Sequence, residues 1–249
     1  AINADIVEDY EAYLKFRGVT PNTTSFYMRI LRAVYNRAVE SGAVEQCYPF
    51  RHVYTGVGKT AKRALSLSVI RKIKLLDLSA LPQADYARDM FMMSFYFRGM
   101  SFIDMAFLRK TDLRCGYITY RRRKTGQTLV IKWTADMQEI LDKYAMNPTE
   151  YLLPIIISNG VADRVAYLRA GNHINYQLKK IAVMVGVTVP LTMYCARHSW
   201  ASAARAKGVP VSIISEGMGH DSEATTRIYL EALDTSSVDK ANDKILRSL

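Results

Sequence analysis

Apolar side chains recur at helical spacing through residues 1–50. Thr20 followed by Pro21 has the form of a helix N-cap with proline at the first helical position. Ser41 and Gly42 are suited to end that helix. We predict that one face of it is apolar, through Phe26, Ile30, Leu31, Val34, Ala38 and Val39. The sequence therefore predicts a small helical region, too small for a robust core of its own.

Residues 51–64 have a different composition. The segment RHVYTGVGKTAKRA contains two glycines, five basic residues and no acidic residue. This composition is typical of a linker. We place one helical domain at residues 1–58 and a second domain at residues 62–249. Because the chain begins within helix-like sequence, we also expect that a preceding segment has been removed.

The second domain mixes two periodicities. Ser66 can cap a helix that reaches about Asp77, and a Met- and Phe-rich helix, expected to lie in the core, follows over residues 85–99. Two short alternating segments, Tyr117–Tyr120 and Thr128–Trp133, flank a turn at Gly126 and predict a β-hairpin. Further helices are predicted at about 134–145, 172–185 and 196–206. The fold class is therefore mainly α with a small antiparallel β-sheet.

The charge of the chain favours an anionic partner. Its 249 residues carry 34 Lys and Arg against 23 Asp and Glu, a formal net charge of +11. For a globular protein this basic, nucleic acid is the usual polyanion. The alternative is that the charge only keeps the protein in solution. With a DNA partner, the basic residues of the linker, Lys59, Lys62 and Arg63, could follow the phosphate backbone, or the segment could be an ordinary solvated loop.

Several protein classes are disfavoured by composition. The three cysteines, Cys47, Cys115 and Cys195, are scattered and form no metal-binding cluster, so we expect no metal, no cofactor and a reducing cytoplasm. The longest apolar run, Leu152–Ile157, is far shorter than the ~20 residues of a membrane helix.

The C-terminal region carries an ordered set of polar residues. Arg197-His198 is followed by Met218-Gly219-His220, and Tyr229 comes nine residues after His220. Together these residues resemble the C-terminal catalytic motif of the tyrosine recombinases, the phage-integrase family. The resemblance implies that Arg197 and His220 hold a DNA phosphate while Tyr229 attacks it. A lone Tyr is more often a buried aromatic, but its position after His220 reverses that expectation.

The reaction needs particular residue types. Without a metal, breaking a phosphodiester needs a nucleophile, cationic donors around the phosphate and an acid for the leaving 5′ oxygen. A guanidinium such as Arg197 can donate to two phosphate oxygens at once. The resemblance places the family's general acid at Lys124, in the predicted hairpin. Unlike its neighbours Arg121, Arg122 and Arg123, a lysine can give up a proton. We expect those arginines to contact DNA, although a solvated hairpin tip is the alternative.

Two positions depart from the family pattern. Tyr194 stands where the family has a histidine three residues before Arg197, and the adjacent His198 would point about 100° away on a helix. Ser101 stands where the family has its first arginine. If the helix continues past Gly99, Arg98 shares a face with Ser101 and can replace that arginine; alternatively, Arg98 only pairs with Asp89 or Asp104.

These features imply a site-specific recombinase with a helical core-binding domain and a catalytic domain. It would act on double-stranded DNA attachment sites through a 3′-phosphotyrosine intermediate. The serine at position 101 resembles the pattern found in integrases of Bacteroides-type mobile elements. This resemblance implies that the protein is located in a bacterial cytoplasm. Two rivals are a topoisomerase-like enzyme, which would reseal the same strand, and a non-catalytic DNA-binding protein on a decayed scaffold.

The C-terminal tail has a different character. Residues 216–249 hold seven acidic residues against four basic ones, so the tail is poorly suited to DNA. The tail also carries an apolar stripe at helical spacing, which must dock on protein; its residues are Val238, Ala241, Ile245 and Leu249. The resemblance implies exchange between protomers of a tetramer on DNA, whereas docking within one chain is equally compatible with the sequence.

Overall fold

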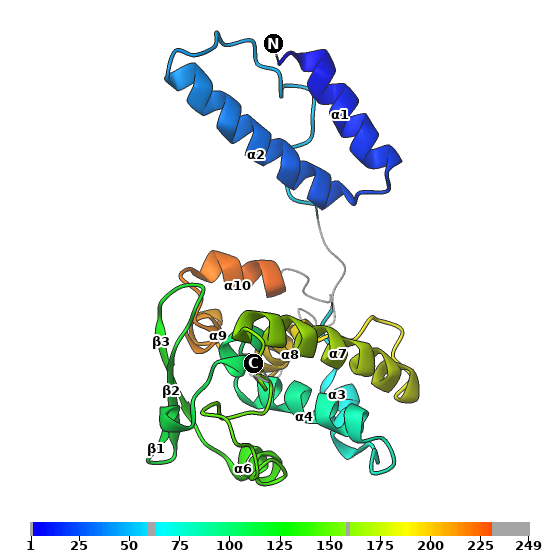
Figure 1. Ribbon diagram of the computed structural model, residues 1–249, viewed down its shortest axis with the longest axis vertical. Coiled ribbons are helices and arrows are strands. Elements are labelled where there is room, and N and C mark those ends of the chain that lie inside the picture. Colours follow the sequence, from blue (N-terminus) through cyan, green and yellow to red (C-terminus); the bar gives the residue numbers. More distant parts are fainter. Residues whose placement is uncertain (1, 59–62, 158–159, 231–249) are drawn as a thin grey trace, which may run out of the picture. The chain divides into compact units, whose positions relative to one another are not determined.

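The computed structural model describes residues 2–58, 63–157 and 160–230, without the side chains of Ile228 and Tyr229. The chain divides into two compact units, Ala1–Lys62 and Arg63–Leu249, each of which is described separately below. Helices dominate the described residues, together with one three-stranded antiparallel sheet, which confirms the predicted fold class (Figure 1). Within the described part of the chain, no helix combines the length and apolar character needed to cross a membrane.

The first unit consists of two helices and an irregular segment. Helix α1 (Ala4–Phe16) is capped by Asn3, whose Oδ1 accepts a hydrogen bond from Ile6 N at 3.0 Å. Helix α2 (Pro21–Glu40) begins after Thr20 and ends at Ser41, as predicted. The small core contains Val7, Leu14, Met28, Tyr35, Phe50 and Val53.

The predicted apolar face of α2 does not pack into this core. Phe26, Ile30 and Val34 are 50, 47 and 60% exposed. A different face is buried because the segment after the helix folds back onto it: Ser25 Oγ donates to Gly56 O, and Asn22 Nδ2 donates to Gly58 O at 3.1 Å. Part of the predicted linker is therefore fastened to α2.

The second unit contains most of the helices and the sheet. Its helices are α3 (Leu67–Leu75), α4 (Pro82–Tyr96), α5 (Phe102–Ala106), α6 (Ala135–Asp142), α7 (Asp163–Met184), α8 (Met193–Ala206), α9 (Val211–Met218) and α10 (Glu223–Leu230), with a 3₁₀ turn at Lys110–Asp112. The strands are β1 (Leu113–Arg114), β2 (Tyr117–Arg121) and β3 (Thr128–Lys132). Strands β2 and β3 pair in antiparallel register from Tyr117 opposite Lys132 to Arg121 opposite Thr128, which confirms the predicted hairpin.

Helix α7 begins well before its predicted start, because Gly171 does not interrupt it. A Cβ on Gly171 would lie 3.1 Å from Cε1 of Phe102, so the glycine lets α7 approach α5 closely. A residue that usually weakens a helix is here used for packing.

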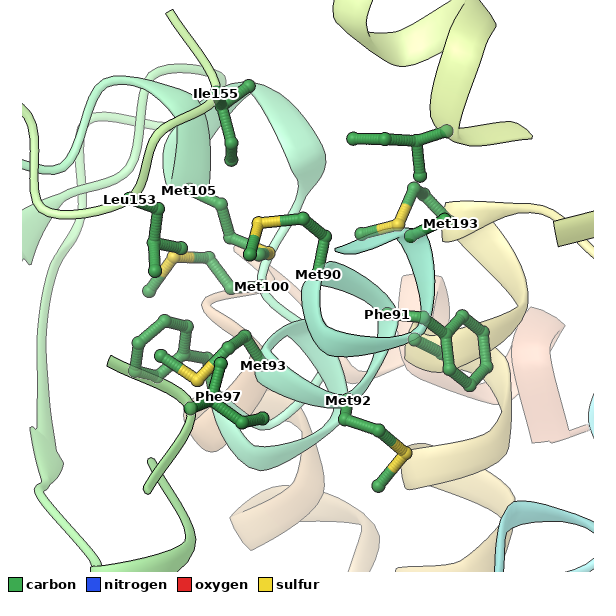
Figure 2. Close-up of a cluster of buried hydrophobic side chains, with 14 of the residues drawn as sticks. Met90, Phe91, Met92, Met93, Phe97, Met100, Met105, Leu153, Ile155 and Met193 are labelled. Carbon is green, nitrogen blue, oxygen red and sulfur yellow. The ribbon is translucent and has the colours of Figure 1, made fainter. Parts of the chain in front are cut away.

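Helix α4 is the centre of the core. It is buried on most of its surface and packs against α7 and α8. Its methionines and phenylalanines gather with residues from neighbouring segments, including Met100, Met105, Leu153 and Met193 (Figure 2). The Met- and Phe-rich segment is thus core, as expected, and α4 forms a fixed support for the residues that follow its C-terminal end.

Substitution of a buried methionine and of an exposed one should change the free energy of unfolding by different amounts. Met93 is fully buried, whereas Met146 is 93% exposed. We expect Met93→Ala to lower the free energy of unfolding by roughly 2–5 kcal/mol, because the substitution leaves a cavity. The control Met146→Ala should change it by about 0.5 kcal/mol or less. Urea denaturation of both variants makes the comparison; similar values would contradict the assignment of α4 to the core.

Candidate active site

The chain turns sharply between α4 and α5. Helix α4 ends at Tyr96, and Arg98 and Gly99 both adopt left-handed conformations, with φ of 57° and 73°. Ser94 Oγ fastens the turn by donating to Met100 O at 2.8 Å. The premise that the helix continues from Arg98 to Ser101 is therefore wrong, because the helix ends before Arg98.

Ser101 has a structural task. It is the N-cap of α5, and its Oγ donates to Oδ2 of Asp104 at 2.6 Å. The other oxygen of the Asp104 carboxylate accepts a hydrogen bond from Arg123 N at 3.0 Å. Asp104 thus ties the start of α5 to the β2–β3 hairpin, and the Ser101 hydroxyl is engaged as a cap.

Arg98 extends towards α9. A Cβ on Gly217 would lie 3.7 Å from Cδ of Arg98. Among the described residues, the ion pairs do not join Arg98 to Asp89 or Asp104. Asp89 instead pairs with Arg88 and Lys143. The pairing considered for Arg98 from the sequence is therefore not found in the described part of the chain.

Arg197 is buried in the first half of α8. Its Nη1 donates to Gly99 O at 2.7 Å, and its Nη2 donates to Met218 O at 2.8 Å. A Cβ on Gly99 would lie only 2.6 Å from Cα of Arg197. Glycine is thus required at position 99 for two reasons, the positive φ and the close approach of α8.

The C-terminal end of α9 holds two guanidinium groups. Gly219 caps this helix with φ of 65°, and the last carbonyl groups of a helix carry a partial negative charge. Met218 O accepts from Arg197, while Gly219 O accepts from Nη1 of Arg122. Two arginines from distant parts of the sequence are therefore brought to one helix end.

Arg122 does not lie where the sequence predicted. We expected it to face a DNA groove with Arg121 and Arg123, but it is buried, whereas its two neighbours are exposed. Residues Ile118, Tyr120 and Arg122 are all buried, so the alternation of β2 continues past the end of the strand. That period of two is the sequence signal that could have revealed it. In the described part of the chain, the ion pairs do not include Arg122.

Three arginines influence the pKa of the buried Tyr120 phenol. Burial raises the pKa of Tyr120, and the nearby negative charge of Asp104 acts in the same direction. The positive charges of Arg197, Arg122 and Arg98 oppose this shift. Arg98 therefore belongs to the same electrostatic neighbourhood as the two guanidiniums at the end of α9.

His220 directly follows the α9 cap. Its Nε2 lies 2.7 Å from Nη2 of Arg197, and its Nδ1 lies 2.7 Å from Oγ1 of Thr226. Burial lowers the pKa of His220 to about 4, and the charges of Arg197, Arg122 and Lys124 act in the same direction. The imidazole is therefore neutral near pH 7.

The β2–β3 hairpin is attached to this site near its tip. Thr125 Oγ1 donates to Gly219 O at 3.5 Å, beside the bond from Arg122. Lys124 is exposed, and its positive charge contributes to the lowered pKa of His220. Arg121 Nε donates to Gly126 O at 2.8 Å, and the guanidinium of Arg123 lies 3.9 Å from the centre of the Phe107 ring.

Tyr194 and His198 flank Arg197 on α8. Their rings meet edge to face at 4.6 Å. Burial, together with the charges of Arg63 and Arg197, lowers the pKa of His198 to about 4. Tyr194 also lines a cavity of about 380 Å³ with Arg197 and Ser101, between α5, α7 and α8.

The remaining predicted residues are placed only in part. Tyr229 lies on α10, nine residues after His220, but its side chain is outside the described part of the structure. Lys59, Lys62 and the tail stripe Val238, Ala241, Ile245 and Leu249 are outside the described residues, and Arg63 is exposed. Sequence reasoning did not identify Thr226, whose contact with His220 requires the fold of α10.

Comparisons with known proteins find similar sequences. A model of the phage integrase SAM-like domain matches residues 1–53. A tyrosine recombinase of Pseudothermotoga lettingae is 24% identical over 68% of this chain and 57% of its own length. Tyrosine recombinase XerA of Thermococcus kodakarensis is 25% identical over 92% of this chain and 77% of its own length.

Solved structures share the fold. A lambda integrase dimer bound to a COC′ core site gives a TM-score of 0.69 at 14% identity, over 92% of this chain and 64% of that one. The Tn1549 transposon integrase in complex with a circular intermediate DNA gives 0.72 at 15% identity, over 98% and 86%. The chain thus spans less than two thirds of the first curated relative and of the lambda integrase chain.

The contact between Gly99 and Arg197 predicts a position-specific loss of stability. Gly99 and Gly186 both have φ of 73°, but a Cβ on Gly186 meets nothing within 4 Å. Gly186→Ala should therefore lower the free energy of unfolding by about 1–2 kcal/mol, through backbone strain alone. Gly99→Ala should lower it by roughly 1–3 kcal/mol more, because the methyl group displaces α8. Equal values for the two variants in urea denaturation would contradict this close approach.

Proposed function

We propose that this chain is a tyrosine recombinase, like the proteins it resembles, and that it breaks and rejoins DNA at specific sites through a covalent 3′-phosphotyrosine intermediate. The observation that carries this proposal is the convergence of Arg197, Arg122 and His220 at the end of α9, on the segment that leads to Tyr229. This arrangement can receive an anion and hold it near the helix that bears a candidate nucleophile.

An anionic substrate fits the electrostatics of the site. Arg122 is buried, and its bonding partner is a backbone carbonyl group rather than a carboxylate. A carbonyl dipole compensates a buried charge less than a full negative charge does. The exposed Lys124 adds further positive potential. A phosphodiester group supplies the missing negative charge and two acceptor oxygens for guanidinium groups.

The reaction divides among the side chains as follows. Arg197 and His220 donate to the non-bridging oxygens, and Tyr229 Oη attacks phosphorus. The phosphorus–oxygen bond to Tyr229 forms while the bond to the 5′ oxygen breaks. Lys124 gives its proton to that oxygen, and the phenolic proton passes to water. In the reverse direction, the 5′-hydroxyl of a partner strand attacks the phosphotyrosine, so the bond energy is conserved.

We propose that Arg122 and Arg98 share the task of the family's missing first arginine. Ser101 is engaged as a helix cap, which supports assigning the role elsewhere. Arg122 is held rigidly by Gly219, and Arg98 leaves α4 in a left-handed conformation directed to α9. Arg98 precedes Ser101 in the sequence, and Arg122 follows it in the hairpin.

The partners also remain proposals. We propose that double-stranded DNA attachment sites contact the exposed hairpin residues Arg121 and Arg123, together with Lys59, Lys62 and Arg63. We further propose a tetramer on DNA in which residues 236–249 dock on a neighbouring protomer, and an origin in a Bacteroides-type mobile element. Two similar structures, a lambda integrase dimer bound to a COC′ core site and a lambda integrase tetramer bound to a Holliday junction, support assembly on DNA as the working model.

A trapped covalent adduct tests the proposed function. The substrate is a nicked duplex carrying the element's own junction sequence, from which the cleaved fragment diffuses away. We expect wild type to form a protein–DNA adduct and Tyr229→Phe to form none, because only the reacting oxygen is removed. Tyr176→Phe, on an exposed tyrosine of α7, is the matched control and should react normally.

The outcomes of that experiment separate the rival functions. An adduct that persists in Tyr229→Phe would exclude this nucleophile. Absence of any adduct in wild type would favour a non-catalytic DNA-binding protein. Relaxation of supercoiled DNA without strand exchange would instead favour a topoisomerase.

The role of Lys124 as general acid gives a chemical prediction. Lys124→Ala should cleave an ordinary strand slowly, by roughly 10²–10⁴-fold. Replacing the bridging 5′ oxygen by sulfur should restore the rate, because a thiolate leaves without protonation. An equal loss on both substrates would show that Lys124 binds phosphate instead of donating a proton.

The buried position of Arg122 predicts a difference between neighbouring arginines. Arg122→Ala should lower the cleavage rate by about 10²–10³-fold, as expected for loss of one preorganised donor. Arg121→Ala, on the exposed side of the same hairpin, should weaken DNA binding modestly. This loss of affinity should become smaller as the salt concentration increases. Cleavage rates at saturating protein and binding isotherms at two salt concentrations distinguish the two effects.

A further inference from the structure

Thr226 connects the candidate active site to the helix that carries Tyr229. Its side chain is fully buried, and its Oγ1 lies 2.7 Å from Nδ1 of His220. It lies on α10, three residues before Tyr229. The roles assigned above to the site residues make no use of this hydroxyl group.

The hydrogen bonds of His220 define its tautomer. A guanidinium group has only donors, so Nε2 of His220, at 2.7 Å from Nη2 of Arg197, must be the acceptor. A neutral imidazole then carries its proton on Nδ1, which donates to Oγ1 of Thr226. In this arrangement the ring presents a lone pair, rather than an N–H group, to Arg197.

A phosphate oxygen reverses the requirement at Nε2. Because that oxygen is an acceptor, Nε2 must carry a proton to donate to it. The ring can gain a second proton, or the proton on Nδ1 can be exchanged for one on Nε2. A threonine hydroxyl supports the exchange, because it can accept from Nδ1–H and can equally donate to an unprotonated Nδ1.

Net protonation is the less favourable route. Burial lowers the pKa of His220, and positive charges face it from α8, through Arg197, and from the hairpin, through Arg122 and Lys124. An arriving phosphate offsets part of this repulsion, but the tautomer exchange needs no additional charge. Each proton lost from Nδ1 is balanced by one gained at Nε2.

We propose that Thr226 is a positioning residue that allows His220 to change from acceptor to donor at Nε2 when a phosphate group enters the site. The same hydrogen bond fastens α10 to His220, so the imidazole and the helix bearing Tyr229 are positioned together. This inference rests on the proposed function for the identity of the substrate, a DNA phosphate.

Two substitutions separate hydrogen bonding from packing. Thr226→Val keeps the shape of the side chain but removes the hydroxyl group, whereas Thr226→Ser keeps the hydroxyl group and removes a methyl group. The full chain is labelled with ¹⁵N at histidine, and inorganic phosphate serves as the probe. His220→Gln identifies the signals of His220 among the four histidines.

In wild type and Thr226→Ser, phosphate should move the proton from Nδ1 to Nε2, with the ring remaining neutral at pH 7. In Thr226→Val, phosphate affinity should fall by about tenfold, as expected for one buried hydrogen bond. Cleavage of the nicked duplex should fall by at least the same factor, while Thr226→Ser should stay close to wild type.

Three results would overturn the inference. These are an Nδ1 that keeps its proton at saturating phosphate, a ring protonated on both nitrogens, and a folded Thr226→Val with wild-type phosphate affinity. Loss of activity in both variants, with unchanged ¹⁵N signals, would also overturn it by indicating a packing role. The phosphate titration is independent of strand cleavage, so a wild-type protein that forms no covalent adduct would contradict only the proposed function.

Discussion

The candidate site depends on one interaction, the binding of guanidinium groups by backbone carbonyl groups at the end of α9. Arg197 and Arg122 come from a helix and a hairpin that are far apart in the sequence, and consecutive carbonyl groups receive them. Helix C-terminal carbonyl groups lack intrahelical partners, so they accept these bonds without loss of helical hydrogen bonds. This interaction brings α8, α9 and the hairpin to a common point and concentrates positive charge there.

The surrounding fold keeps that point rigid. Helix α4, buried in the methionine-rich core, ends where the backbone turns through Arg98 and Gly99, and Gly99 O receives Arg197. A second support comes from Asp104, which joins the N-terminus of α5 to the hairpin. The guanidinium groups are therefore oriented before any substrate arrives, which lowers the cost of ordering them during a reaction.

The sequence predicted much of this arrangement where the signal was local. Thr20-Pro21, the alternation in Thr128–Lys132 and the order of Arg197, His220 and Tyr229 each depend on residues close to one another or in fixed order. The family assignment rests on that order and is supported by the comparisons. The roles of individual residues, in contrast, stay predictions.

Other features depend on tertiary packing and could not be predicted from local patterns. The buried face of α2 is selected by residues 50–58, which fold back onto it, so apolar spacing alone indicated the wrong face. The expectation that Arg98 and Ser101 share a helix face was wrong because Arg98 and Gly99 both adopt left-handed conformations. The contact of Thr226 with His220 exists only once α10 lies against the end of α9.

The hairpin has a further consequence for how this architecture tolerates change. Its turn is closed by hydrogen bonds from Gly126 N to Arg122 O and from Arg122 N to Gln127 O, both at 2.8 Å. Arg122 and Thr125 are bound to Gly219 on either side of Lys124. The spacing along this short segment is therefore as constrained as the identity of its residues. A single inserted residue would shift Lys124 relative to its anchors, so the hydrogen bonds that hold Arg122 and Thr125 also fix the length of the loop.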